Sequence, residues 1–349
     1  MARWLIPVGL AIVTSVGMHA ACSASNDVNQ ATGGSGTTTT STSSDIGLDG
    51  GDIDLDACAG AHCSADLHTL VDCSGNVVMT CPDDQGCSGT SCVPACASAS
   101  DNKSTFGCDY YAIGPDIIFD GAGACFAAFV VNTWTTPVGV TVDYEGQQLD
   151  VTKFAYIPSG SGASIQYKPL TTGQIPPGEV AILFLNRFGF NPLGLVTDCP
   201  LGVTPAIVTK DTAPHGTTLG SAFHIATTAP VVSYDIYPYG GGQSALTSAT
   251  LLLPTSASDT NCVAVDAYGP GIFGGPFIAI VAQEDGTQVT VNPSADIAAS
   301  PTVAGTPKGT PAKYDLARGQ VLQFTQPTPL AGSVIQSNVP VGVWGGKTN

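Results

Sequence analysis

Histidines are the first residues to consider for chemistry, because an imidazole can act as a general base or a metal ligand. The chain has five of them in 349 residues. His19 falls in an apolar N-terminal segment, and His62 and His68 stand among cysteines. Only His215 and His224 belong to the long C-terminal region, where we expect His215 in a loop and His224 in a strand. A Ser-His-Asp triad also needs a positioned nucleophile, which no motif of this chain supplies.

Two pairs of acids are the best-placed candidates for acid–base chemistry. Asp143 with Glu145, and Glu284 with Asp285, would suit glycoside hydrolysis, which uses two carboxylates. Both pairs stand at or near expected turns, and Asp285-Gly286 has the residue types of a two-residue hairpin turn. The chain also lacks the patterns G-x-S-x-G, H-E-x-x-H and G-x-x-x-x-G-K-[ST]. We therefore expect no catalytic residues, no metal and no cofactor.

Cysteines are dense between residues 57 and 96, where polar and Gly-rich connectors separate them. In an exported protein this density is typical of a disulfide framework, and we expect a separate unit with almost no apolar core. Zinc is the alternative, but the spacings are not C-x2-C pairs. The disulfide candidates are Cys58, Cys63, Cys73, Cys81, Cys87, Cys92, Cys96 and Cys108.

The total of twelve cysteines raises a question about pairing. We set aside a lipid-modified Cys22, six cysteines of the framework, and a bridge between Cys96 and Cys108. Cys125, Cys199 and Cys262 then remain. We expect one of these three to be unpaired or to lack its partner.

The first 21 residues have the pattern of a signal peptide. One early charge, Arg3, precedes an apolar run that is too short for a transmembrane helix. The sequence His-Ala-Ala-Cys resembles a bacterial lipobox, so we expect lipid attachment at Cys22. Ordinary signal-peptidase cleavage is the alternative. The next residues, 22–56, lack aromatic side chains and are rich in Ser, Thr, Gly and Asp, which predicts a disordered tether.

Charge narrows the class of partner. The formal net charge is −17 with only ten Lys and Arg residues, so binding to nucleic acid is not expected. The same charge disfavours electrostatic binding to an anionic membrane surface. We therefore expect membrane attachment through a lipid anchor only. A surface glycan or a protein is the expected partner. Tyr234, Tyr237 and Tyr239 beside a run of glycines are binding candidates, with packing in the core as the alternative, and alternation predicts one shared face for Tyr237 and Tyr239.

From Cys108 onward the sequence reads as strands. Short runs rich in Val, Ile, Tyr and Phe are separated by Gly, Pro, Asn, Asp and Ser, without intervening helices. Three phrases recur in the same order: Cys125–Gly146, Leu170–Leu185 and Leu219–Gly241 match the later runs that begin at Phe277, Tyr314 and Leu330. We expect two degenerate copies of one β module. The predicted class is all-β, with two tandem sandwich-like modules; a propeller-like arrangement is the alternative.

Four motifs carry a family resemblance. AQEDGTQVTV, LARGQVLQF and GSVIQSNVPVGVWGG, with KSTFGCDYYAI upstream, resemble the N-terminal domain of the IgG-Fc-binding-protein family. The resemblance extends from about Cys96 to Asn349 and brings no catalytic residues. It implies a secreted or surface protein in bacteria. The closing motif lies inside the domain of that family, which implies a second module that is incomplete at its C-terminus. The family name implies an immunoglobulin ligand, which no residue pattern here indicates.

These observations give one interpretation. The expected parts are a signal peptide (1–21), a tether (22–56), a Cys-rich module (57–96), a first β module (97–242) and a second β module (243–349). We expect a lipid-anchored protein of the bacterial cell surface or outer membrane that faces an oxidising compartment, or alternatively a secreted one. The predicted function is adhesion or ligand binding without catalysis. A structural envelope or matrix component is the alternative, and a polysaccharide hydrolase is less favoured.

Overall fold

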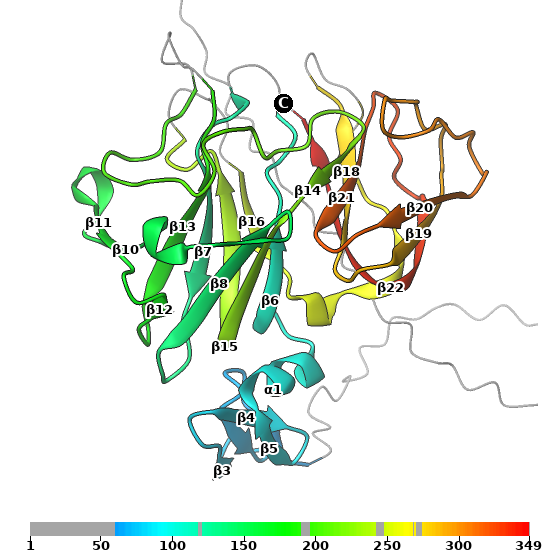
Figure 1. Ribbon diagram of the computed structural model, residues 1–349. Helices are drawn as coiled ribbons and strands as arrows, with labels where there is room; N and C mark the ends of the chain where they lie inside the picture. Colours follow the sequence, from blue (N-terminus) through cyan, green and yellow to red (C-terminus); the bar gives the residue numbers. More distant parts are fainter. Residues whose placement is uncertain are drawn as a thin grey trace, which may run out of the picture.

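The computed structural model describes residues 60–117, 121–189, 196–241, 248–267, 269 and 274–348. In Figure 1 a small module that contains helix α1 lies below the first of two β modules, which stand side by side. The expected signal peptide, the tether, Cys22 and Cys58 lie outside the described residues. Within the described residues, no helix is long and apolar enough to cross a membrane.

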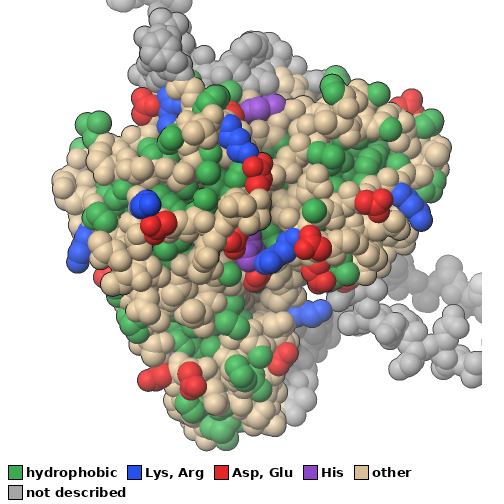
Figure 2. Space-filling model, in the orientation of Figure 1, with side chains coloured by type: hydrophobic (Ala, Val, Ile, Leu, Met, Phe, Trp, Pro, Cys, Tyr) green, Lys and Arg blue, Asp and Glu red, His purple; other side chains and the backbone are tan. Residues whose placement is uncertain are grey.

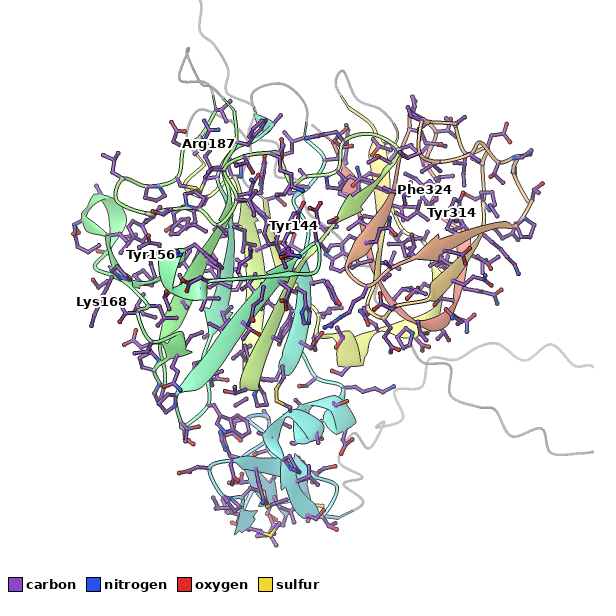
Figure 3. All side chains as sticks on the ribbon, viewed as in Figure 1. Tyr144, Tyr156, Lys168, Arg187, Tyr314 and Phe324 are labelled. Carbon is purple, nitrogen blue, oxygen red and sulfur yellow. A yellow bond between two sulfur atoms is a disulfide. The ribbon has the colours of Figure 1, made fainter. Side chains whose placement is uncertain are left out.

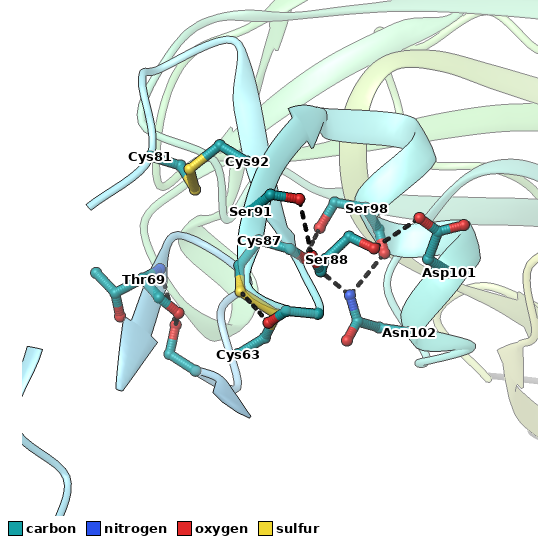
Figure 4. Close-up of a disulfide and its surroundings, with 12 residues drawn as sticks. Cys63, Thr69, Cys81, Cys87, Ser88, Ser91, Cys92, Ser98, Asp101 and Asn102 are labelled. Atoms are coloured by element: carbon teal, nitrogen blue, oxygen red, sulfur yellow. Dashed lines mark hydrogen bonds between the residues drawn. A yellow bond between two sulfur atoms is a disulfide. The ribbon is translucent and has the colours of Figure 1, made fainter. Parts of the chain in front are cut away.

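The small module is held by disulfides and short strands. Its elements are β1 (His62–Cys63), β2 (Thr69–Val71), β3 (Val77–Thr80), β4 (Gln85–Ser88), β5 (Ser91–Pro94) and α1 (Ala95–Asn102). The bridges Cys63–Cys87 and Cys81–Cys92 cross it, and the hydroxyl of Ser98 donates to the carbonyl of Cys87 (Figure 4). The disulfide-rich N-terminal region is therefore confirmed.

We expected the small module to be a separate unit with almost no apolar core. The structure shows instead that it shares a core with the first β module. Leu67, Ala95 and Ala99 belong to the same apolar core as the first β module. The indole N–H of Trp134 in that module donates to the carbonyl of Asp83 at 2.6 Å. The sequence did not indicate this contact, because cysteines dominate the segment and only a few of its apolar residues take part in the shared core.

The first β module is one sheet that folds over on itself. Its strands are β6 (Gly107–Ala112), β7 (Phe126–Val131), β8 (Val138–Tyr144), β9 (Gln147–Leu149), β10 (Ala155–Ser159), β11 (Gln166–Pro169), β12 (Gln174–Ile175), β13 (Val180–Asn186), β15 (Phe223–Tyr237) and β16 (Ser248–Leu252), with short 3-10 turns η2 (Val151–Lys153) and η3 (Gly162–Ser164). The first part of β15 pairs with β6 and β8, and its last part pairs with β7 and β16. Side chains alternate across a strand, so one face of each half turns inward. Tyr110 and Leu183, from opposite halves, meet in one core.

The second β module has the same design. Its strands are β14 (Thr218–Ser221), β17 (Asp259–Val263), β18 (Pro276–Ala282), β19 (Thr287–Asn292), β20 (Ala312–Leu316), β21 (Gln320–Thr325) and β22 (Val334–Lys347), and η5 (Thr255–Ala257) precedes β17. The first part of β22 pairs with β17 and β19, and its last part pairs with β18. Tyr314 and Phe324 meet edge to face inside it, with ring centroids 5.8 Å apart (Figure 3). The sandwich-like class is thus confirmed.

The order of strand pairing is the same in both modules. β7 and β8 lie on opposite parts of β15, as β18 and β19 lie on opposite parts of β22. β12 then lies on β8 and β13 on β7, as β20 lies on β19 and β21 on β18. The phrases that recur in the sequence form these corresponding strands.

The turn at Asp285-Gly286 does not close a hairpin. We expected its two flanking strands, β18 and β19, to pair with each other, but each pairs with β22. The chain crosses here from one half of the sheet to the facing half, since both strands direct alternate apolar side chains into the same core. The turn chemistry itself was predicted correctly: Gly286 has a φ of 70°, which glycine adopts without steric cost.

The two β modules are joined by an apolar contact and by strand β14. This strand precedes β15 in the chain, yet it pairs with β21 of the second module, across the expected boundary at residue 242. Tyr111, Ile113 and Ala222 of the first module pack on the outer face of β18. Strand β18 is consequently buried on both faces, which explains its uninterrupted apolar sequence PFIAIVA.

Candidate functional site

A hollow of about 600 Å³ lies where the two β modules and helix α1 meet. We term it the seam crevice. Figure 2 shows acidic, basic and histidine side chains along this junction, with other charged side chains on the flanks of both β modules and on the small module. Its walls come from α1, β6, β22 and the segment around η5, and from the connections that follow β18 and β20. The lining residues are Cys96, Ser100, Gly107, Cys108, Asp109, Pro254, Thr255, Ser256, Gln283, Glu284, Asp285, Arg318 and Pro340.

Strand β15 places His224 beside this crevice. The pairing register sets His224 opposite Asp143 of β8 on one side and opposite Tyr111 of β6 on the other. Its Nε2 lies 2.8 Å from a carboxylate oxygen of Asp109, and its Nδ1 lies 3.3 Å from one of Asp143. The ring is buried, so both nitrogens are engaged by carboxylates instead of water. His224 thus links two acids of the first module.

Arg318 reaches the same cluster from the second module. One terminal nitrogen lies 3.2 Å from Nε2 and 3.4 Å from Nδ1 of His224, so it contacts both ring nitrogens. Its Nε donates to the hydroxyl of Tyr111 at 3.2 Å, and that hydroxyl donates to the carbonyl of Gln283 at 3.2 Å. Burial raises the pKa of Tyr111, which keeps this donor protonated. The cluster therefore fixes the second module against the first.

The catalytic arrangements considered from the sequence do not form around His224. Asp143 binds the ring, whereas Glu145 accepts a hydrogen bond from Lys210 at 2.6 Å. The ring's hydrogen-bond partners among the described residues are Asp109, Asp143 and Arg318. In the described part of the chain, therefore, no serine, threonine or cysteine side chain is hydrogen-bonded to the ring. The cluster is better suited to holding structure than to proton transfer.

Three carboxylates line the crevice, from Asp109, Glu284 and Asp285. Asp285 accepts the backbone N–H of Arg318 at 3.0 Å, as a turn residue. Glu284 is exposed, and its carboxylate has no hydrogen-bond partner among the described residues. The described chain holds no group of three or more His, Cys, Asp or Glu side chains arranged for a metal ion. A crevice with this charge balance attracts a cationic group.

A second histidine cluster also joins the modules. Nδ1 of His215 lies 3.3 Å from Asp116, and Nε2 lies 3.1 Å from Asp211. These contacts raise the pKa of His215 to about 10, against the opposing effect of burial. Asp116 is buried and also accepts hydrogen bonds from Thr325 at 2.8 Å and Gln323 at 3.2 Å, both in β21. A charged His215 thus holds a loop of the first module on the second sheet.

The structure resolves the question of pairing for the described cysteines, none of which is free. Cys96 bonds Cys108, and Cys125 bonds Cys199. Cys73 and Cys262 also take part in disulfides. The expectation that one of the last three cysteines is unpaired is therefore wrong. The partners of the Cys125–Cys199 bridge are 74 residues apart, and they meet because the loop after β13 returns to the start of β7.

Tyr237, a predicted binding residue, is a core residue. Its side chain is 2% exposed and faces the interior of the first module. Its hydroxyl donates to the carbonyl of Gly121 at 2.6 Å and accepts the backbone N–H of Ala124 at 3.1 Å. A ligand therefore has no access to Tyr237 in this structure.

Tyr234 and Tyr239 lie on the opposite, outer face of the same sheet. Tyr234 is half-buried and stacks on Phe129 with ring centroids 4.6 Å apart. The hydroxyl of Tyr239 lies 2.9 Å from that of Tyr167. The expected shared face of Tyr237 and Tyr239 is wrong, because β15 ends at Tyr237 and strand alternation no longer applies beyond it.

Sequence reasoning placed His224 in a strand, as the structure does, but missed its partners. Asp109 and Asp143 stand 115 and 81 residues away in the chain. A signal was present: each of the three residues is a titratable group directly beside an apolar core residue of its strand. Only the strand register, which sequence does not give, brings them together.

Comparison with known proteins locates the resemblance. No curated protein and no solved structure matches the chain. A family model described as IgGFc binding protein matches residues 248–349, which contain Glu284, Asp285 and Arg318 but not Asp109 or His224. The resemblance seen in the closing motifs is therefore confirmed over residues 248–349, and we term this part of the chain the IgGFc-binding-like domain because of that similarity.

Proposed function

We propose that this protein is an extracellular binding protein that holds a protein ligand in the seam crevice and catalyses no reaction. The observation that carries the proposal is the composition of the crevice. One wall, with Glu284 and Arg318, comes from the IgGFc-binding-like domain, and the other, with Asp109, comes from the first β module. The disulfides support an extracellular location, because such bridges persist in oxidising compartments.

The charges indicate the chemistry of the ligand. Arg318 is occupied by His224 and Tyr111, whereas the carboxylate of Glu284 is exposed at the rim. A ligand segment with Lys or Arg side chains complements this surface, and the chain's net charge of −17 attracts it over a distance. The name of the matching family makes an immunoglobulin Fc fragment the first protein to test. A surface glycan is the competing ligand.

The proposal includes attachment to a bacterial surface. Lipid at Cys22 and the polar residues 22–56 would hold the β modules away from the membrane, and both of these predictions rest on sequence alone. The mass of the mature N-terminus of the exported protein tests this part. An unmodified chain that begins at another residue would remove the anchor from the proposal and leave the crevice unaffected.

The test of function is a binding assay with a matched pair of charge variants. An IgG Fc fragment and a glycan array are applied to the immobilised chain, as wild type, Glu284→Lys and Glu179→Lys. Glu179 is an exposed acid at the turn before β13, outside the crevice lining. Since one exposed ion pair contributes about 0.2–1 kcal/mol, Glu284→Lys should weaken Fc binding several-fold and Glu179→Lys should not. Binding of glycan alone, or hydrolysis of a glycan, would overturn the proposal.

A further inference from the structure

The contact between the two β modules uses two surfaces, and each has a counterpart elsewhere on the chain. The first surface is the outer edge of β6 with the residues around it, represented by Tyr111, Ile113 and Ala222. The second is the outer face of β18 and β22, where Ala279 and Trp344 lie. Because the modules share one pairing order, the register identifies both counterparts.

The counterpart of the covered outer face lies on the first module. Phe129 of β7 stands opposite Tyr234 of β15, just as Ala279 of β18 stands opposite Trp344 of β22. Both Phe129 and Tyr234 are half-buried, and Leu251 on the neighbouring strand β16, opposite Tyr234, is 42% exposed. We term this surface the β7–β15–β16 face. It is apolar like its counterpart; Phe129 also packs against Tyr239 of the same chain, whereas Leu251 remains open to solvent.

The counterpart of the outer edge of β6 lies on the second module, along β17. Tyr110 of β6 stands opposite Ile225, and Cys262 of β17 stands opposite Ile335, with all four in the cores of their modules. Since side chains alternate along a strand, the residues after Tyr110 and Cys262 point outward. β17 thus presents its outer side as β6 does.

The last outward residue of β17 and the corresponding residue just beyond the strand are exposed and apolar, whereas Asn261, two positions earlier on the same side, is exposed and polar. Val263 corresponds to Tyr111 and is 59% exposed, and Val265 corresponds to Ile113 and is 38% exposed. Val334, which pairs with Val263 in the neighbouring strand, is 40% exposed. We term these three valines the β17 patch. Val263 and Val334 adjoin across the two strands, and adjoining exposed apolar side chains are a starting point for an interaction site.

We propose that the β17 patch of one chain docks on the β7–β15–β16 face of a second copy, so that the contact between modules continues from molecule to molecule. The two surfaces are the unused halves of an interface that the chain already forms once. They differ from each other, so the contact is heterologous and leads to a row or ring of copies instead of a closed two-fold dimer. This inference does not depend on the seam crevice or its ligand.

The test is the oligomeric state of the purified full chain, measured by sedimentation velocity over a range of concentrations. Val263→Asp removes the β17 patch, Leu251→Asp removes the opposing face, and Val77→Asp, at a valine 61% exposed in the small module, is the matched control. We expect wild type and Val77→Asp to associate with rising concentration, and Val263→Asp and Leu251→Asp to stay monomeric. Melting temperatures show whether each variant is folded, and Val334→Lys replaces Val263→Asp if it is not.

Mixing gives the decisive result. Val263→Asp keeps an intact β7–β15–β16 face and Leu251→Asp keeps an intact β17 patch, so an equimolar mixture should form one-to-one dimers and nothing larger. A wild-type chain that stays monomeric at all concentrations would overturn the inference. So would association that persists in both variants, or two monomeric variants that do not pair when mixed.

Discussion

Removing the hydroxyl of Tyr237 measures whether this residue serves the fold or a ligand. In Tyr237→Phe the carbonyl of Gly121 and the N–H of Ala124 each lose one hydrogen bond, and they keep the 3.1 Å bond that joins them to each other. A typical intramolecular hydrogen bond contributes about 0.5–1.5 kcal/mol, so the loss of two should lower the free energy of unfolding by roughly 1–3 kcal/mol. For a unit of this size each kcal/mol lowers the melting temperature by about 2–4 °C. Tyr237→Ala also removes the buried ring and should cost roughly 3–5 kcal/mol.

The assay compares thermal and urea unfolding of the exported chain with Tyr234→Phe as the control. Tyr234 lies in the same strand on the outer face, and its hydroxyl has no hydrogen-bond partner among the described residues. Its loss should change stability by about 0.5 kcal/mol or less. Fc or glycan binding should be unchanged in Tyr237→Phe. A variant as stable as wild type, or one that loses binding at unchanged stability, would refute the assignment of Tyr237 to the core.

Three further predictions concern pH and disulfides. Contacts with Asp116 and Asp211 raise the pKa of His215 from 6.5 to about 10, so its stabilising effect is complete below about pH 6.5 and is lost as the pH rises through about 10. The melting temperature of His215→Gln should lack this fall between pH 6.5 and 10. A variant with the same dependence on pH as wild type would contradict the assignment. Burial raises the pKa of Asp235, so the folded state loses stability as the pH rises above 3.8, where this carboxyl ionises in the unfolded chain. Asp235→Asn should therefore melt at a higher temperature than wild type at pH 7. A lower melting temperature would count against a protonated carboxyl in the folded state. Each of the bridges Cys63–Cys87 and Cys81–Cys92 contributes roughly 2–5 kcal/mol, so their reduction should unfold the small module and expose Trp134 to water. We expect a red shift of tryptophan fluorescence and an unchanged β-sheet circular dichroism spectrum. Unchanged fluorescence would contradict the contact of Trp134 with that module.

The sequence predicted which segments are strands and which of their faces are apolar. Short β-rich runs and recurring phrases were enough to expect two sandwich-like modules. It did not predict strand partners, because alternation reports the face of a strand and not its neighbour. The two arms around Asp285-Gly286 alternate as hairpin arms do, yet both lie on β22. The crossing of β14 into the second sheet had no sequence signal for the same reason.

The candidate site was harder to predict than the fold. Its ionic cluster needs β6, β8 and β15 in register and a turn from the second module, so four distant segments contribute. The sequence left two interpretations of Tyr237 open, a binding residue or a core residue, and the second holds because the residue is the last of a strand whose inner face it fills. Local composition did not show on which side of the sheet it lies.

Hydrogen–deuterium exchange of the full chain, with and without an IgG Fc fragment, tests the central claim that both β modules contribute to one binding site. Ligand should slow exchange at residues 283–286 and 318 in the second module and at 107–109 in the first, because these segments form opposite walls of the seam crevice. Protection in one module alone, or protection confined to the β7–β15–β16 face, would contradict it.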